Sequence, residues 1–97
     1  MHDIEPTEIK KEIIQFVSPT CSSCTLQEKV LINILNEYSD IIINNYNIYS
    51  HYDKAVQYSV KGAPTLVFLE NNRVLKSHYG FQNEEEVKNW MKLFEWI

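Results

Sequence analysis

Two cysteines, Cys21 and Cys24, lie where an apolar, β-branched run gives way to a helical pattern. The run Ile13-Ile14-Gln15-Phe16-Val17 lacks clean polar alternation, which predicts a central strand buried on both faces. Two thiols separated by two residues at a helix start can close into a small disulfide ring. The same placement sets the first sulfur against unpaired backbone N–H groups, which favour a thiolate. This junction therefore predicts redox chemistry.

Composition narrows the class of protein further. The chain has 97 residues, 44% of them hydrophobic, so we expect residues 1–97 to form a single domain with its own core. A formal charge of -4 with interspersed lysines and acids argues against a nucleic-acid surface or a basic membrane face. No window reaches the roughly 20 apolar residues of a membrane span, and the first residues do not resemble a signal peptide. We expect a cytoplasmic monomer whose partners are proteins.

The segment that follows the cysteines predicts an amphipathic helix, beginning near Ser22. Apolar residues recur there at helical spacing, and polar residues occupy the opposite side. The apolar set is Val30, Leu31, Ile34, Leu35 and Tyr38, and the polar set is Gln27, Glu28, Asn33 and Glu37.

The rest of the chain continues an alternation of strands and helices. We predict strands at 41–48, 65–69 and 74–79, a short helix at 53–58, and a turn at 70–73. The acidic run Glu84 to Glu86 suits a helix N-terminus, and the buried stripe of that helix is expected to comprise Val87, Trp90, Met91, Phe94 and Ile97. With residues 1–12 as a lead-in segment, the order is βαβαββα, an α/β fold with a four-stranded mixed sheet and helices on both faces. The cysteines then lie at the carboxyl end of the first strand, where ligand chemistry in open α/β sheets tends to gather.

Three motifs in this order resemble the thioredoxin family. They are Cys21-Ser22-Ser23-Cys24 after a strand, Val60-Lys61-Gly62-Ala63-Pro64-Thr65 before a hairpin, and Gly80 at the end of that hairpin. The match covers about residues 13 to 97 and implies the small form of the thioredoxin-like fold.

The resemblance also implies roles for individual residues. Cys21 corresponds to the exposed nucleophilic thiol and Cys24 to the buried resolving thiol. Pro64 corresponds to a cis-proline beside the disulfide, which leaves the Ala63 backbone free to pair with an extended substrate; a trans turn proline is the alternative. Gly80 corresponds to a glycine that keeps the substrate groove open, with Phe81 beside it as a groove residue.

The chain departs from the family pattern around and beneath the cysteines. Thr20 stands where an aromatic residue usually precedes the first cysteine, and Ser22 and Ser23 replace Gly-Pro, so the redox potential cannot be inferred. Gln15 and Asn45 replace a buried aspartate and its lysine partner. We expect these two amides to hydrogen-bond to each other or to water beneath the disulfide, the alternative being ordinary polar residues without influence on the site.

We expect a further tuning contact from Ser22 and Ser23, as hydrogen-bond donors to the sulfur. A zinc site is the alternative use of two cysteines at this spacing. The chain has no second cysteine pair, however, and His51 and His78 do not form a ligand-spaced motif. We therefore predict no metal and no cofactor besides the Cys21–Cys24 disulfide.

The function that these features favour is thiol–disulfide oxidoreduction, in which protein disulfides are reduced and an electron donor resembling thioredoxin reductase regenerates the dithiol. A glutaredoxin-like, glutathione-dependent reductase is the first alternative, although the Gly-Gly-x-Asp signature of glutaredoxins is absent after Gly80. The second alternative is a non-catalytic interaction module of thioredoxin-like fold.

Overall fold

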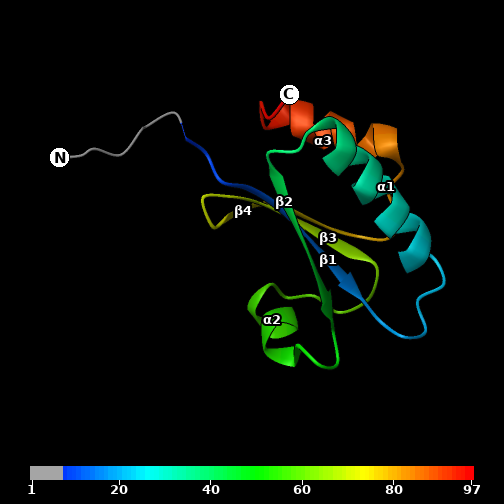
Figure 1. Ribbon diagram of the computed structural model, residues 1–97. Coiled ribbons are helices and arrows are strands. Elements are labelled where there is room, and N and C mark those ends of the chain that lie inside the picture. Colours follow the sequence, from blue (N-terminus) through cyan, green and yellow to red (C-terminus); the bar gives the residue numbers. More distant parts are fainter. Residues whose placement is uncertain (1–7) are drawn as a thin grey trace.

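A computed structural model describes residues 8–97 and has the predicted βαβαββα order (Figure 1). Most boundaries lie within one or two residues of those predicted from the sequence. The elements are β1 (Lys11–Val17), α1 (Cys24–Glu37), β2 (Ile41–Asn47), α2 (Tyr52–Gln57), β3 (Thr65–Glu70), β4 (Arg73–Tyr79) and α3 (Glu84–Leu93).

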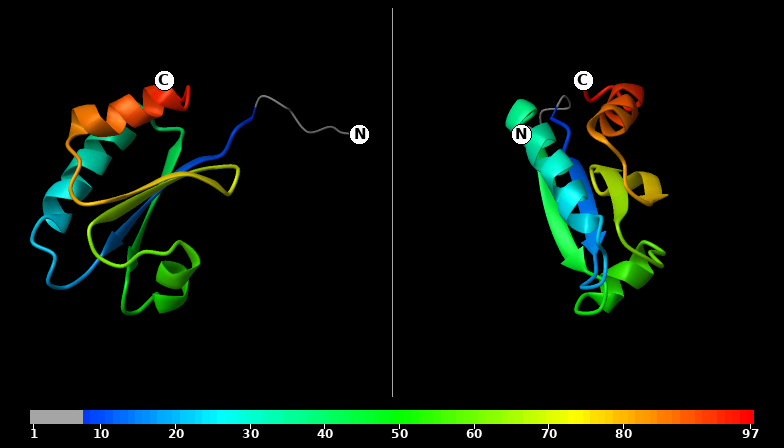
Figure 2. Two further views of the ribbon diagram at one scale, coloured as in Figure 1. Left: turned by 180° about the vertical axis from the view of Figure 1, so that it is seen from behind. Right: turned by 90° about the vertical axis from the view of Figure 1, so that its right-hand side faces the viewer.

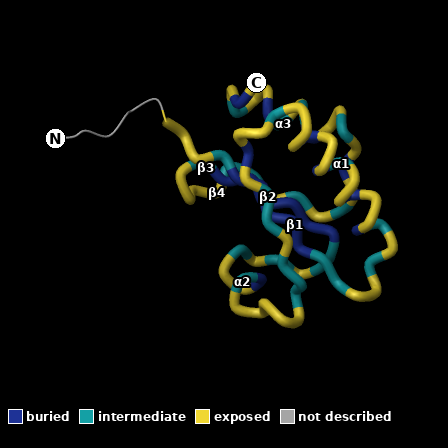
Figure 3. Tube along the Cα trace, in the orientation of Figure 1, coloured by how far each residue is buried: buried dark blue, intermediate teal, exposed yellow. Residues whose placement is uncertain are grey.

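The sheet is mixed, with strand order β2-β1-β3-β4. β1 runs parallel to β2 and antiparallel to β3, and β3 and β4 form the antiparallel hairpin. The five residues from Glu12 to Phe16 are all buried, which confirms β1 as a central strand covered on both faces (Figure 3).

Helices cover both faces of the sheet, as predicted: α1 and α3 lie on one face and α2 on the other (Figures 1 and 2). The cores reflect the alternation of side chains along each strand. On the α1–α3 face, Ile13, Leu66 and Phe68 pack with helix residues Leu31 and Met91. The next set along the strands, Ile14, Phe16, Val67 and Leu69, packs around Ala55 of α2.

The buried face of α1 differs from the predicted one. Gln27, assigned to the polar side from its residue type, is wholly buried, whereas Leu35 is 36% exposed. The buried residues are Cys24, Gln27, Leu31 and Ile34, whose spacing of three, four and three is that of one helix face. The polar side chain of Gln27 is buried because it finds partners in the loop before α3.

The end of α3 corrects a second prediction. The N-terminus is held by a capping box between Asn83 and Glu86, as its acidic start suggests. The helix ends at Leu93, and the left-handed Glu95 (φ 62°) reverses the chain. The N–H groups of Glu95 and Trp96 then donate to the carbonyls of Lys92 and Met91, which is a Schellman motif. Trp96 is therefore buried, and Ile97, predicted to be buried, is 39% exposed.

The predicted lead-in of residues 1–12 is also too long. β1 begins at Lys11, and Glu12 is buried. Lys11 donates to Asp40 at 3.0 Å, and Asn44 donates to the Glu12 carboxylate at 2.7 Å. These contacts with β2 and the turn before it extend the strand by two residues beyond the apolar run. Residues 1–7 of the lead-in lie outside the described part of the chain.

No helix within residues 8–97 has the length and apolar character needed to cross a bilayer.

Candidate functional site

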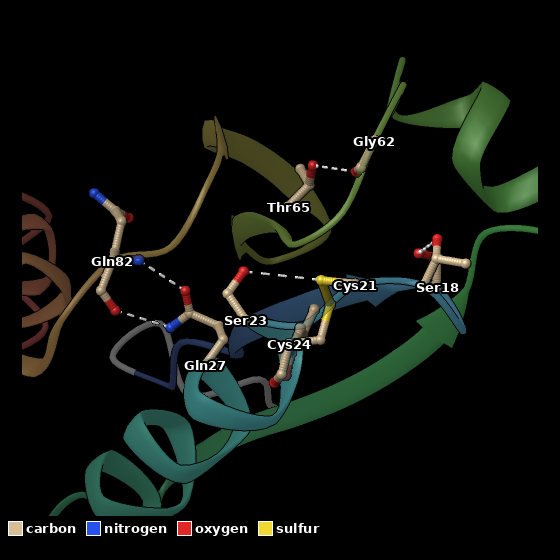
Figure 4. Close-up of a disulfide and its surroundings, with 10 residues drawn as sticks. Ser18, Cys21, Ser23, Cys24, Gln27, Gly62, Thr65 and Gln82 are labelled. Carbon is tan, nitrogen blue, oxygen red and sulfur yellow. Dashed lines mark hydrogen bonds between the residues drawn. A yellow bond between two sulfur atoms is a disulfide. The ribbon is translucent and has the colours of Figure 1, made fainter.

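Cys21 and Cys24 are joined by a disulfide, with Cα atoms 5.4 Å apart (Figure 4). The turn that follows β1 delivers Cys21, and Cys24 is the first residue of α1. Cys21 is half-buried, while Cys24 is only 7% exposed. The first turn of α1 contains no acidic residue, and its N-cap Ser23 makes no side-chain capping bond. The positive end of the helix dipole is therefore left to act on the sulfurs, where it favours a thiolate.

The two serines between the cysteines are placed differently. The Ser23 hydroxyl lies 4.0 Å from Cys21 Sγ, and because a disulfide sulfur carries no proton, the hydroxyl is the donor of this long contact. Ser22 is exposed, and no hydrogen bond links it to either sulfur in the described structure. Of the two predicted donors, only Ser23 faces the disulfide.

Gln15 lies beneath the disulfide and is completely buried. Its Nε2 donates to the Cys24 carbonyl at 3.0 Å, tying β1 to the start of α1. Its Oε1 is buried without a hydrogen-bond partner among residues 8–97. Of the two expected arrangements, a direct bond to Asn45 or a bond to water, the direct bond is not made. Although Asn45 is the register partner of Gln15 in β2, it is exposed because β2 is an edge strand.

Asn45 instead lines a hollow of about 300 Å³ beside the disulfide. The hollow is lined by Val17, Ser18, Pro19, Cys21, Cys24, Thr25, Glu28 and Asn45. Glu28 is the only carboxylate in this lining, and its polar residue type alone predicts no more than a place on the solvent-facing side of the helix. Its position four residues after Cys24, which places both on neighbouring turns of one helix face, is the signal that could have identified it.

Pro64 and Gly80 are brought together by the β3–β4 hairpin. The Ala63–Pro64 peptide bond is cis, and the Gly80 N–H donates to the Pro64 carbonyl at 2.8 Å. Thr65, the next residue, pairs with Phe16 near the end of β1. Because β1 and β3 are antiparallel, Pro64, just before β3, lies at the same end of the sheet as the turn after β1 that carries Cys21. The sequence-predicted residues of the two motifs therefore share one end of the sheet.

The loop after β4 carries the other predicted groove residues. Gly80 adopts φ +108°, which L side chains rarely adopt, and Phe81 is 41% exposed. Ala63 is half-buried. The loop is also held by a residue that is not among the predicted site residues: Gln27 accepts from the Gln82 N–H at 2.8 Å and donates to the Gln82 carbonyl at 3.0 Å (Figure 4).

The histidines of the zinc alternative do not line the hollow that contains the cysteines. His51 is exposed and packs against Tyr46, with ring centroids 4.9 Å apart. Within residues 8–97, no three His, Cys, Asp or Glu side chains are grouped as metal ligands.

Comparisons with known proteins agree with this arrangement. The thioredoxin family model matches residues 3–93. Thioredoxin from Buchnera aphidicola is 29% identical over 80 residues, which are 81% of this chain and 74% of that protein. Thioredoxin-1 from Drosophila melanogaster is 27% identical over 89 residues, covering 91% and 82%. The crystal structure of the Drosophila germline-specific thioredoxin Deadhead superimposes with a TM-score of 0.77 at 26% identity, covering 87% of this chain and 80% of that one. The chain belongs to the thioredoxin family, and its Cys21–Cys24 disulfide makes it a thiol–disulfide oxidoreductase.

Proposed function

We propose that the protein reduces protein disulfides through a dithiol–disulfide cycle of Cys21 and Cys24. The observation that carries this proposal is the unequal exposure of two bonded cysteines at a helix N-terminus: Cys21 is half-buried and Cys24 is 7% exposed. A bulky protein substrate reaches only the more accessible sulfur. Cys21 is accordingly the nucleophile, and Cys24 is the resolving thiol.

The cycle balances as two successive thiol–disulfide exchanges. The Cys21 thiolate attacks one substrate sulfur, the substrate S–S bond breaks, and the departing substrate thiolate takes up a proton. Cys24, once deprotonated, attacks Cys21 Sγ, the mixed disulfide breaks, and the second substrate thiolate leaves. Two electrons have passed to the substrate, and the Cys21–Cys24 bond has formed. A reductase of the thioredoxin reductase class returns two electrons, and no other cofactor takes part.

Proton transfer from Cys24 is assigned to the hollow beside it. Burial raises the pKa of a thiol, and Cys24 is buried, so its deprotonation needs an acceptor. Gln15 carries an amide, which does not accept this proton as a carboxylate would. Glu28 lines the same hollow as both cysteines, so its carboxylate is placed to accept the proton through water.

Substrate binding is assigned to the end of the sheet where four residues from two segments meet: Ala63 and Pro64 before β3, and Gly80 and Phe81 after β4. The Gly80–Pro64 hydrogen bond holds the two segments together, and the partly exposed Phe81 offers apolar area to an extended chain. We place the activity in the cytoplasm, because a reducing thiol pool there keeps such a couple cycling, and we assign it to a monomer.

Two cysteine variants test the proposal. Wild-type protein supplied with a dithiol reductant should reduce the disulfides of a test protein such as insulin, and Cys21→Ser should have no such activity. Cys24→Ser should accumulate a mixed disulfide at Cys21, seen as a mass increase that a reductant reverses. Full activity in Cys21→Ser would overturn the assignment. Turnover of glutathione disulfide without turnover of protein disulfides would favour the glutaredoxin-like alternative, and absence of both activities the non-catalytic module.

A further inference from the structure

Gln27 is a buried amide whose two side-chain hydrogen bonds both go to one loop residue. Its side chain is 0% exposed and makes two hydrogen bonds, both to the main chain of the same residue, Gln82, 55 positions away. Gln27 accepts a hydrogen bond from the Gln82 N–H and donates one to the Gln82 carbonyl. The amide thus satisfies both main-chain groups of Gln82, as a neighbouring β-strand would. Two bonds from one planar group fix both the position and the orientation of that loop.

The loop concerned lies between two other fixed points. At one end, the Gly80 N–H is bonded to the Pro64 carbonyl. At the other end, Asn83 caps α3 through its capping box with Glu86. Phe81 lies between Gly80 and Gln82 and remains 41% exposed. The main chain at Phe81, and with it the direction in which the side chain leaves the loop, is therefore held from both sides.

The helix that carries Gln27 also carries the resolving cysteine. Gln27 lies three residues after Cys24 on the same buried face of α1, and the carbonyl of Cys24 accepts from Gln15 of β1. A continuous set of hydrogen bonds thus links the disulfide-bearing helix, the 80–82 loop and the cis-proline segment. Each of these bonds is 3.0 Å or shorter.

We propose that Gln27 is a positioning residue for protein substrates: it holds the loop that carries Phe81 at a fixed distance from the disulfide. This inference rests on the proposed protein-disulfide reductase function and adds a residue to it. An apolar side chain would fill the same space without the desolvation cost of an amide. The amide instead holds the loop in one position through two directional hydrogen bonds. A protein substrate contacts this loop and depends on its position, whereas a small disulfide reaches the cysteines without contacting it.

The test compares Gln27→Met with wild type on two substrates. Methionine is similar in length, apolar and a good helix former, so packing is largely kept while both bonds are lost. We expect KM for a protein disulfide to rise about tenfold, the factor that corresponds to about 1.4 kcal/mol. We expect kcat and the rate with a small aromatic disulfide to stay unchanged, because loss of uniform binding raises KM alone.

Leu31→Ala is the matched control. Leu31 lies one turn further along the same buried face of α1, so this variant loses stability without touching the loop. If Leu31→Ala raises KM for the protein disulfide as much as Gln27→Met does, the role of Gln27 is only structural and the proposal is wrong. Equal losses on both substrates would also overturn it, because the disulfide itself would then be disturbed.

A measurement independent of activity separates this proposal from the proposed function. Amide hydrogen exchange of oxidised Gln27→Met should be faster than wild type at Gly80 and Gln82 and unchanged in the central strand β1. Unchanged exchange at Gln82 would refute the loop attachment even in an active enzyme. Failure of wild-type protein to reduce any protein disulfide would instead refute the proposed function, whatever the exchange result.

Discussion

Replacing Gln15 by aspartate should add a pH dependence to the free energy of unfolding that the natural chain does not have. Gln15 is 0% exposed, its Nε2 donates to the Cys24 carbonyl at 3.0 Å, and its Oε1 has no partner in the described structure. An aspartate carboxylate in this place would lose its hydration and would bring a second acceptor towards the Cys24 carbonyl. Both effects disfavour the charged form and raise the pKa of the introduced carboxyl.

The size of the expected loss of stability follows from the complete burial of position 15. Fully buried carboxyls reach shifts of about 3 to 5 pKa units, and one unit corresponds to about 1.4 kcal/mol. A shift of about 3 units would therefore lower the free energy of unfolding by about 4 kcal/mol once the group ionises. Between an unfolded pKa of about 3.9 and the raised folded pKa, the native state binds more protons than the unfolded state. Stability should consequently fall by about 1.4 kcal/mol per pH unit across that window and level off above it.

Gln15→Asn is the matched control, because asparagine has nearly the shape of aspartate but no charge. Urea unfolding of both variants would be followed between about pH 4 and pH 8, with the disulfide closed so that no thiol titrates. The difference in unfolding free energy between the two should be small at the acid end and grow with pH. A difference that stays constant, or an aspartate variant that gains stability with pH, would refute the view that this site desolvates a carboxylate and offers it no hydrogen-bond donor from residues 8–97.

Two further predictions concern the loop and the surface. Gly80→Ala should lower the free energy of unfolding by about 1 to 3 kcal/mol, because Gly80 has φ +108° while the nearest atom to an added Cβ, His78 Nε2, is 4.0 Å away; the cost is therefore conformational, and unchanged urea unfolding would contradict it. Asp40→Asn should cost about 0.5 kcal/mol at neutral pH, because the hydrogen bond from Lys11 lowers the pKa of the Asp40 carboxyl. Since that folded pKa lies below the unfolded one, the contribution exists above the unfolded pKa and disappears as pH falls through the folded pKa. Unfolding curves of variant and wild type should therefore differ at about pH 7 and converge in acid, where the carboxyl is protonated in both states. A difference that persists in acid would exclude the ion pair as its source.

The strand and helix order was predictable because periodicity reports burial directly. The continuous apolar run of β1 and the 3.6-residue spacing of α1 were both present in the sequence. The burial of Gln27 is not predictable in the same way, because a polar residue type on a helix ordinarily indicates exposure. Its spacing from Cys24, Leu31 and Ile34 was already that of the buried face, but the partner that satisfies its amide is a loop 55 residues away, which no local pattern indicates.

The misplaced chain end has a different cause. The predicted stripe to Ile97 assumed that α3 continues, whereas the helix stops through a left-handed Glu95. Glycine and asparagine are the usual residues in that conformation, so a glutamate gives no sequence signal for the stop. The relation of Gln15 to Asn45 was predicted in part: the two are register partners, but whether an edge-strand side chain turns inward depends on what covers it.

The turn at Glu95 also decides what intrinsic fluorescence can report. It places Trp96 against Phe68 and Phe94, with its indole N–H donating to Glu70 and its carbonyl accepting from Lys11. Lys11 is the first residue of β1, whereas the disulfide follows the last residue of that strand. A strand of seven residues is about 20 Å long, so Trp96 and the disulfide lie near opposite ends of β1. Trp90, the other tryptophan, stacks on Phe94 in the second half of α3. Both tryptophans thus belong to the cluster around Phe94, and their emission should report the unfolding of this cluster at the end of β1 away from the disulfide.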